Sequence, residues 1–158
     1  MIGFAFHEIM EGSVQRLGER FDRPFRFEVD VSTPKVIARV AMCDAEGSLR
    51  IDGFAKDAHA KGRLEMSPLV ERRIRYVLDF EADDGERYQF DGSKRIAPFG
   101  ALPHTLLESW TTLPGLVTRA SGATWGHALL RFHMGRDLRG LLASMRVGPG
   151  RLLKAAHV

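Results

Sequence analysis

The first candidates in this sequence for a metal site or a reactive thiol are six histidines and one cysteine. No pair of histidines has the spacing of a zinc motif and no cysteine cluster supports one, so we expect no metal site. The lone Cys43 cannot form an internal disulfide, and we expect a small, buried residue there. The histidines are His7, His59, His104, His127, His133 and His157.

Motifs for covalent or phosphate chemistry are missing from the sequence. No serine stands in a Gly-x-Ser-x-Gly elbow, and there is no Gly-x-Gly-x-x-Gly run or phosphate loop. We therefore expect no cofactor, and the sequence contains no recognisable catalytic motif.

Polar residues within apolar runs are better candidates for a site. Glu108 shares strand parity with Leu106 and Trp110, so its carboxylate would point into an apolar interior. There it would be a general base with a raised pKa, or the partner of a buried arginine. The alternative is that the opposite parity faces inward and Glu108 lies in water.

Aromatic residues give a second set of candidates. They would line a pocket for a flat apolar ligand or simply fill the core. Lys94, which follows Asp91-Gly92-Ser93, would reach a ligand carboxylate at the mouth of a barrel, or would be an ordinary exposed turn lysine. The ligand-binding candidates are Tyr76, Phe80, Phe90, Lys94, Glu108, Trp110 and Trp125.

The elements that must position these residues are strands, because apolar and polar residues alternate with period two. The clearest runs are 25–31, 73–80, 87–91 and 127–133. Weaker strands are expected at 4–10, 36–42, 49–54, 63–66, 94–96, 106–112 and 116–119. We predict an all-β fold, an antiparallel, lipocalin-like β-barrel or closed sandwich of about ten strands.

Turns and a helix complete this prediction. Turns are expected at 45–47, 60–62, 83–85 and 121–122, each of which contains glycine. Residues 11–24 are predicted to be a loop with at most a helical turn, because Gly12, Gly18 and Pro24 interrupt the pattern. A short C-terminal helix is expected where Leu138, Leu141, Leu142 and Met145 form one apolar stripe.

Length and charge limit the functional classes. The 158 residues fit a single domain, which we place at 1–147, followed by a basic tail or linker at 148–158. The net charge is +3, and five basic residues stand against one acidic residue from Arg136 onward. That segment lacks interleaved aromatics, so we expect no nucleic-acid binding. With no signal sequence and no apolar run of about 20 residues, we expect a cytoplasmic protein without a transmembrane segment.

The order of several short motifs carries a resemblance. The chain opens with Phe6-His7-Glu8-Ile9-Met10-Glu11-Gly12 and continues with Tyr76-Val77-Leu78-Asp79-Phe80 and Phe90-Asp91-Gly92-Ser93-Lys94. Later come Trp110-Thr111-Thr112-Leu113 and Ser144-Met145-Arg146-Val147. This order resembles the β-rich accessory domain found beside bacterial oxidoreductases of the glucose–methanol–choline, cholesterol-oxidase-like type. The resemblance covers most of residues 4–147, and it implies a non-catalytic module near lipid or sterol chemistry.

Three functional hypotheses follow. The first is a non-catalytic barrel that binds an apolar small molecule, lipid or sterol-like, and serves a partner oxidoreductase. The second is a protein-interaction or regulatory module without a ligand. The third is a small barrel isomerase or cyclase, in which at least two of Glu108, His104 and Tyr76 would have to converge in one pocket.

Overall fold

The computed structural model describes residues 2–33, 41–67, 71–95, 111–132, 143 and 146–149. Nine β-strands lie in these ranges, and all are connected in one sheet. They are β1 (Ile2–Arg16), β2 (Arg23–Thr33), β3 (Ala41–Ile51), β4 (Ala55–Ser67), β5 (Arg73–Glu81), β6 (Arg87–Arg95), β7 (Thr112–Arg119), β8 (Thr124–Arg131) and β9 (Arg146–Pro149).

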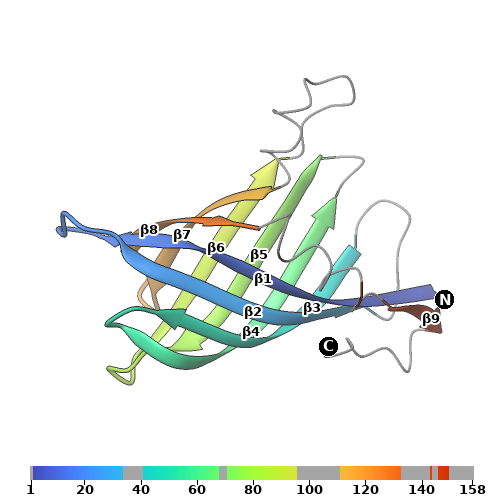
Figure 1. Cartoon of the computed structure of the whole chain (residues 1–158), viewed down its shortest axis with the longest axis horizontal. Helices are drawn as coiled ribbons and strands as arrows, with labels where there is room; N and C mark the ends of the chain where they lie inside the picture. The colour runs from blue at the N-terminus through green and yellow to red at the C-terminus, as the bar shows by residue number, and fades with distance from the viewer. Residues whose placement is uncertain are drawn as a thin grey trace.

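Strands β1 to β8 form a closed antiparallel barrel in which each strand pairs with its neighbours in sequence (Figure 1). Strand β1 closes the barrel because it pairs with both β2 and β8. On the β8 side of β1, residues 11–16 pair with β8 and the first residues, Ile2–Ala5, pair with β9. Closure removes the unpaired strand edges that would otherwise invite aggregation. The predicted all-β barrel is thus confirmed, whereas the alternative of a ten-strand closed sandwich is not.

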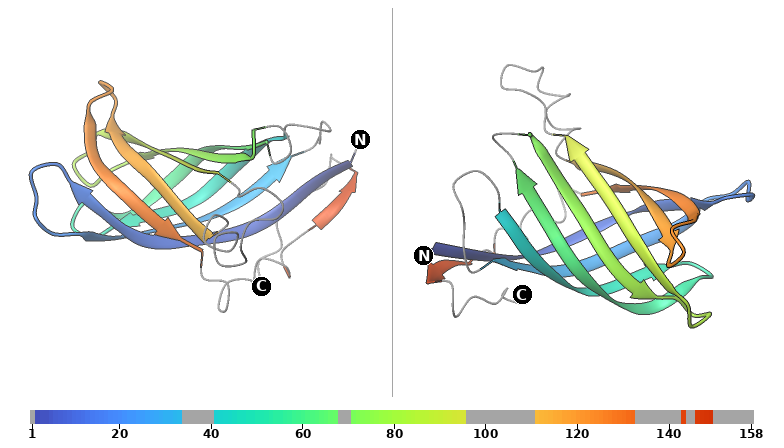
Figure 2. Two further views of the ribbon diagram at one scale, coloured as in Figure 1. Left: turned by 90° about the horizontal axis from the view of Figure 1, so that it is seen from above. Right: turned by 180° about the vertical axis from the view of Figure 1, so that it is seen from behind.

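Four hairpins lie together at one end of the barrel, which we call the hairpin end (Figure 1). They join β1 to β2, β3 to β4, β5 to β6 and β7 to β8. The β1–β2 hairpin projects beyond the other three, as both views of Figure 2 show. The predicted turns at 83–85 and 121–122 are confirmed, and Gly85 and Gly122 adopt positive φ angles of 79° and 88° there.

The barrel interior is formed by alternate residues, as the period-two pattern predicts. In β2 these residues are Phe25, Phe27, Val29 and Val31, and in β5 they are Ile74, Tyr76, Leu78 and Phe80; all are buried. The strands are up to 15 residues long, so the barrel is made of fewer and longer strands than expected.

Two predicted turns inside the sheet are wrong and one predicted loop is shorter than expected, and glycine explains each difference. Residues 11–16 belong to β1, and Pro24 is the second residue of β2, close to the strand end where a missing N–H is tolerated, so the loop predicted at 11–24 is confined to residues 17–22. Residues 45–47 lie inside β3 and residues 60–62 inside β4. A Cβ at Gly12, Gly47 or Gly62 would collide with a carbonyl oxygen of the neighbouring strand. These glycines therefore permit close strand approach instead of turns.

The remaining predictions fall partly outside the described residues. The helix expected over 138–145 lies outside them, apart from Ala143. The strands expected at 36–42 and 106–112 are described only at their last residues, which belong to β3 and to the start of β7.

Candidate functional site

Aromatic rings fill the barrel interior at the hairpin end. The Phe54 ring stacks on Trp125 with centroids 4.0 Å apart, and it meets Tyr88 edge-on at 4.7 Å. Tyr88 in turn stacks on Phe80 at 6.0 Å. Such pairs add to the burial energy of the rings. This packing occupies the hairpin end, so any space for a ligand has to lie farther from the hairpins.

Three ionisable side chains lie inside the barrel away from the hairpins, and we call them the interior polar cluster: Glu8 of β1, Tyr76 of β5 and Lys94 of β6. The exposed fractions of Glu8 and Lys94 are 7% each, and that of Tyr76 is 2%. The Tyr76 hydroxyl donates a hydrogen bond of 2.7 Å to Glu8 Oε2. The Lys94 ammonium lies over the Tyr76 ring, with Nζ 5.7 Å from the centroid.

Strand parity explains why these polar groups face inward. Glu8 alternates with His7 and shares its face of β1 with Met10 and Val14, which are fully buried. Lys94 shares its face of β6 with Phe90. Between them lies Gly92, where a Cβ would come within 2.6 Å of the Phe90 ring. A side chain at position 92 would therefore displace the ring that packs beneath the cluster.

Burial and mutual attraction act in opposite directions on the cluster. Burial raises the pKa of Glu8, while the charge of Lys94 and the hydrogen bond from Tyr76 oppose the rise. Burial lowers the pKa of Lys94, and the Glu8 carboxylate opposes this effect. Burial, together with the charge and hydrogen bond of Glu8, raises the pKa of Tyr76 well above its usual value. The acid and the amine are thus both driven toward their neutral forms.

This arrangement places an acid, a hydroxyl and an amine together in the largely apolar interior of the barrel. A carboxyl group with a raised pKa is a better general acid than an ordinary surface carboxyl. A buried lysine with a lowered pKa can act as a nucleophile. The nearby Cys43 is less suited to chemistry, because burial and the charge of Asp44 raise its pKa to about 12. The thiol is therefore protonated at neutral pH, and the thiolate is the reactive form.

Most of the sequence-predicted site residues face the interior. Four aromatic candidates are buried there, as expected whether they line a pocket or fill the core: Tyr76, Phe80, Phe90 and Trp125. Lys94 lies in β6 and is buried, so the exposed turn lysine of the alternative interpretation is excluded. The candidates Glu108, Trp110 and His104 lie outside the described residues.

Sequence reasoning missed Glu8, although a signal for it was present. Glu8 shares parity with Phe6 and Met10, so the pattern that flagged Glu108 would also have flagged Glu8. The hydrogen bond to Tyr76 could not have been found in this way, because 68 residues separate the two.

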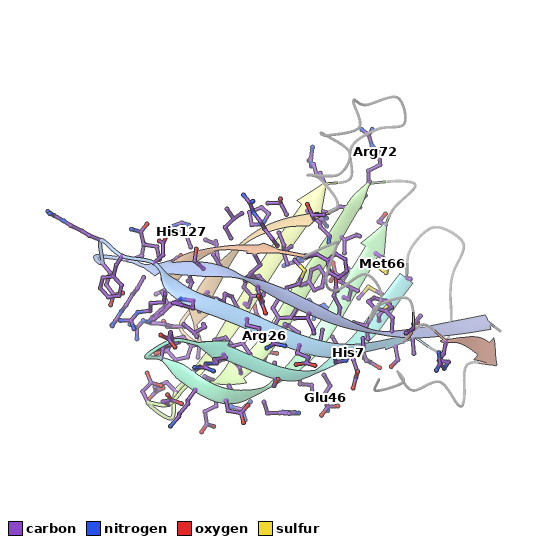
Figure 3. The ribbon with its side chains drawn as sticks, in the orientation of Figure 1. His7, Arg26, Glu46, Met66, Arg72 and His127 are labelled. Atoms are coloured by element: carbon purple, nitrogen blue, oxygen red, sulfur yellow. The ribbon has the colours of Figure 1, made fainter. Side chains whose placement is uncertain are left out.

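His7, labelled in Figure 3, lies on the outer face of β1. Two carboxylates of β2 flank its ring. Its Nδ1 is 2.7 Å from Asp30 Oδ1 and its Nε2 is 2.7 Å from Glu28 Oε1. Ionised carboxylates only accept hydrogen bonds, so both ring nitrogens must donate and the imidazole is held as a cation. Burial lowers the pKa of His7, but the hydrogen bonds and charges of Asp30 and Glu28 outweigh it and raise the pKa.

Exposed large apolar side chains lie in separate places on the described surface. Leu17 and Phe21 are at the tip of the β1–β2 hairpin, with exposed fractions of 54% and 56%. Leu116 and Leu129 lie on the outer faces of β7 and β8, and Met42 lies on β3. Small separate groups of this kind are common on protein surfaces.

Neither the described residues nor the comparisons with known proteins assign a metal site, a membrane-spanning helix or a family. Within the part of the chain that the structure describes, no three His, Cys, Asp or Glu side chains gather as metal ligands do. In the same residues, no helix is long and apolar enough to cross a membrane. Comparisons with protein-family models, curated proteins and solved structures give no match.

Proposed function

We propose that the barrel binds an apolar small molecule whose neutral polar end group meets the interior polar cluster. The observation that carries this proposal is the burial of Glu8, Tyr76 and Lys94 together inside a largely apolar barrel. Ionisable groups are costly to bury, and a core of this size would be more stable with apolar residues in their place. Small-molecule sites typically combine an apolar lining with a few polar groups that fix orientation.

The charge of the cluster supports a neutral end group, such as a hydroxyl or a carbonyl. Glu8 and Lys94 are one acid and one base, so the pair carries no net charge when both are ionised and none when both are neutral. A charged ligand would lose its hydration without meeting a net opposite charge. A hydroxyl or carbonyl group needs only a donor or an acceptor, and the cluster offers both.

A lipid or sterol-like ligand fits this chemistry, because such molecules combine a large apolar body with one hydroxyl or ketone. The resemblance to accessory domains of cholesterol-oxidase-like oxidoreductases supports the same class. In this proposal the chain is a lipocalin-like, non-catalytic module that presents its ligand to a partner enzyme.

A second candidate function is a small barrel isomerase, and the Glu8–Tyr76 pair favours it. A carboxyl group with a raised pKa, hydrogen-bonded to a phenol, could move a proton within a bound ketone. In this candidate Glu8, instead of Glu108, is the general base. Exchange of the ligand's α-hydrogens for deuterium, followed by mass spectrometry, separates this candidate from simple binding.

The proposal is tested by native mass spectrometry and calorimetry with three probes that share one chain length: dodecanol, dodecanoate and dodecyltrimethylammonium. We expect one dodecanol per chain and weaker binding of both charged probes. Lys94→Met and Tyr76→Phe should weaken dodecanol binding, whereas Lys61→Met, at an exposed lysine on the outside of β4, should not.

Protein purified from its own host and extracted with solvent gives an independent measurement. A co-purifying neutral lipid near one per chain supports the proposal. Absence of a host lipid together with no dodecanol binding would overturn it. Equal binding of all three probes to the wild type and to Lys94→Met would overturn the role of the cluster.

A further inference from the structure

Lys94 differs from the other lysines that the structure describes. The side chains of Lys56 and Lys61 are exposed on β4, whereas Lys94 is 7% exposed and lies inside the barrel. A lysine can bury its carbon chain and keep its ammonium in water, but Lys94 also places its Nζ over the Tyr76 ring, in the interior. The interior polar cluster thus contains a primary amine away from bulk water.

We propose that Lys94 forms a reversible imine with the carbonyl carbon of an apolar aldehyde bound in the barrel. This inference rests on the proposed function, because the aldehyde must first enter the same apolar space. It names the carbonyl class of ligand and adds a covalent step that binding alone does not require.

The reaction balances with the groups present in the cluster. The neutral amine of Lys94 adds to the carbonyl carbon, and a proton passes from nitrogen to oxygen to give a carbinolamine. The carbinolamine then loses its hydroxyl group as water, with the proton supplied by a neutral Glu8 carboxyl. The products are one water molecule and a protonated imine, and the Glu8 carboxylate remains as its counter-ion.

Three features of the site favour this chemistry. Burial lowers the pKa of Lys94 and raises that of Glu8, so a neutral amine and a neutral acid are both favoured. Tyr76 contacts both groups, through its hydroxyl with Glu8 and through its ring with Lys94, and therefore holds them near one point. The apolar surroundings keep water low, which slows hydrolysis of the imine.

The test uses decanal with sodium cyanoborohydride, which reduces an imine to a stable amine, followed by peptide mapping. We expect one decyl group on Lys94. Burial lowers the pKa of Lys94 and so leaves more of its amine neutral at neutral pH, so Lys94 should be labelled faster than Lys61. Lys94→Arg keeps a positive charge but removes the nucleophile, and should lose this label while Lys61 keeps its slow labelling.

Glu8→Gln cannot supply the proton for loss of water, so its labelling at Lys94 should slow by roughly 10²-fold, the lower range for general acids. Near-ultraviolet circular dichroism confirms that each variant is folded. Calorimetry with decanol, which cannot form an imine, distinguishes the two possible failures. Decanol binding with Lys94 labelled no faster than Lys61 would overturn the imine alone, whereas absence of decanol binding would overturn the proposed function too.

Discussion

The Tyr76 hydroxyl donates a 2.7 Å hydrogen bond to the Glu8 carboxylate across the interior of the barrel. In a closed order of eight strands, β5 lies four strands from β1 in either direction, so the bond joins opposite walls. It therefore depends on barrel closure and on the inward parity of both strands. The two strands do not pair, and the bond is one of the contacts that bring them together.

Removing this hydroxyl should destabilise the fold. In Tyr76→Phe the carboxyl of Glu8 stays buried but loses its donor, and an unsatisfied buried group costs about 1–3 kcal/mol. Because the hydrogen bond lowers the pKa of Glu8, its loss should also drive Glu8 further toward its neutral form. Urea unfolding at neutral pH measures the free energy of unfolding.

Tyr88→Phe is the matched control for this change. The Tyr88 hydroxyl also donates a 2.7 Å hydrogen bond, but to Asp84 in the exposed β5–β6 hairpin. Water can replace the donor there, so the loss should stay below about 1 kcal/mol. An equal decrease in the free energy of unfolding in both variants would show that the buried Glu8–Tyr76 hydrogen bond stabilises the fold no more than the exposed one.

Glu8 should make the stability of the protein depend on pH in the direction opposite to that of a carboxylate whose pKa is lowered by folding. Burial raises the pKa of Glu8 in the folded state above its usual 4.5. Between these two values the folded state holds a proton that the unfolded state has released, so stability falls as the pH rises through this window. Glu8→Gln removes the effect and should gain stability relative to the wild type as the pH rises.

Glu19→Gln provides the control with the opposite sign. The hydrogen bond from Arg23 lowers the pKa of Glu19, so its contribution is present above the usual value of 4.5 and is lost as the pH falls. Glu19→Gln should therefore lose stability relative to the wild type as the pH rises. Unfolding curves for both variants across the acidic range check the two signs. Parallel curves for Glu8→Gln and the wild type would contradict the assignment to Glu8.

The barrel class was predictable because the strongest strands carry their own pattern. In 25–31 and 73–80 apolar residues recur at every second position, and Asp83-Asp84-Gly85 is a sequence typical of a hairpin turn. The glycines were harder to interpret. Gly85 has open space around it and a positive φ, whereas Gly47 lies against the carbonyl of Glu28. Both look alike in sequence, since only the neighbouring strand distinguishes them.

The candidate site was predictable only in part, for a related reason. Parity indicates which side chains of a strand face inward, so Lys94 and Tyr76 could be selected and Glu8 could have been. Which of them meet depends on how strands distant in sequence are arranged around the barrel. That arrangement follows from closure through β1 and β8, which no local pattern shows.

His7 should stabilise the fold under mildly acidic conditions. Its folded-state pKa is raised above 6.5, so the stabilisation is fully present below that value and is lost as the pH rises through the folded-state pKa. His7→Gln should therefore cost more near pH 6 than near pH 9, and two partly exposed ion pairs are worth about 0.2–1 kcal/mol each. His59→Gln is the control, since exposed His59 meets one carboxylate, Glu46, at 2.8 Å. A cost for His7→Gln that does not vary with pH would contradict a cationic His7.

Gly62 and Gly85 should respond differently to the same substitutions. A Cβ at Gly62 would collide with the backbone oxygen of Val77, so Gly62→Ala forces β4 and β5 apart and should cost about 3 kcal/mol or more, the upper range for overpacking. Gly85 has open space but a φ of 79°, so Gly85→Ala should cost about 1–2 kcal/mol.

Asparagine separates the two causes, because it tolerates the left-handed backbone but still carries a Cβ. Gly85→Asn should recover most of the stability that Gly85→Ala loses, whereas Gly62→Asn should recover none. Urea unfolding of the four variants provides the comparison. Recovery at Gly62 would mean that backbone conformation matters at this position instead of close strand approach. The interpretation of the glycines inside β1, β3 and β4 would then fail with it.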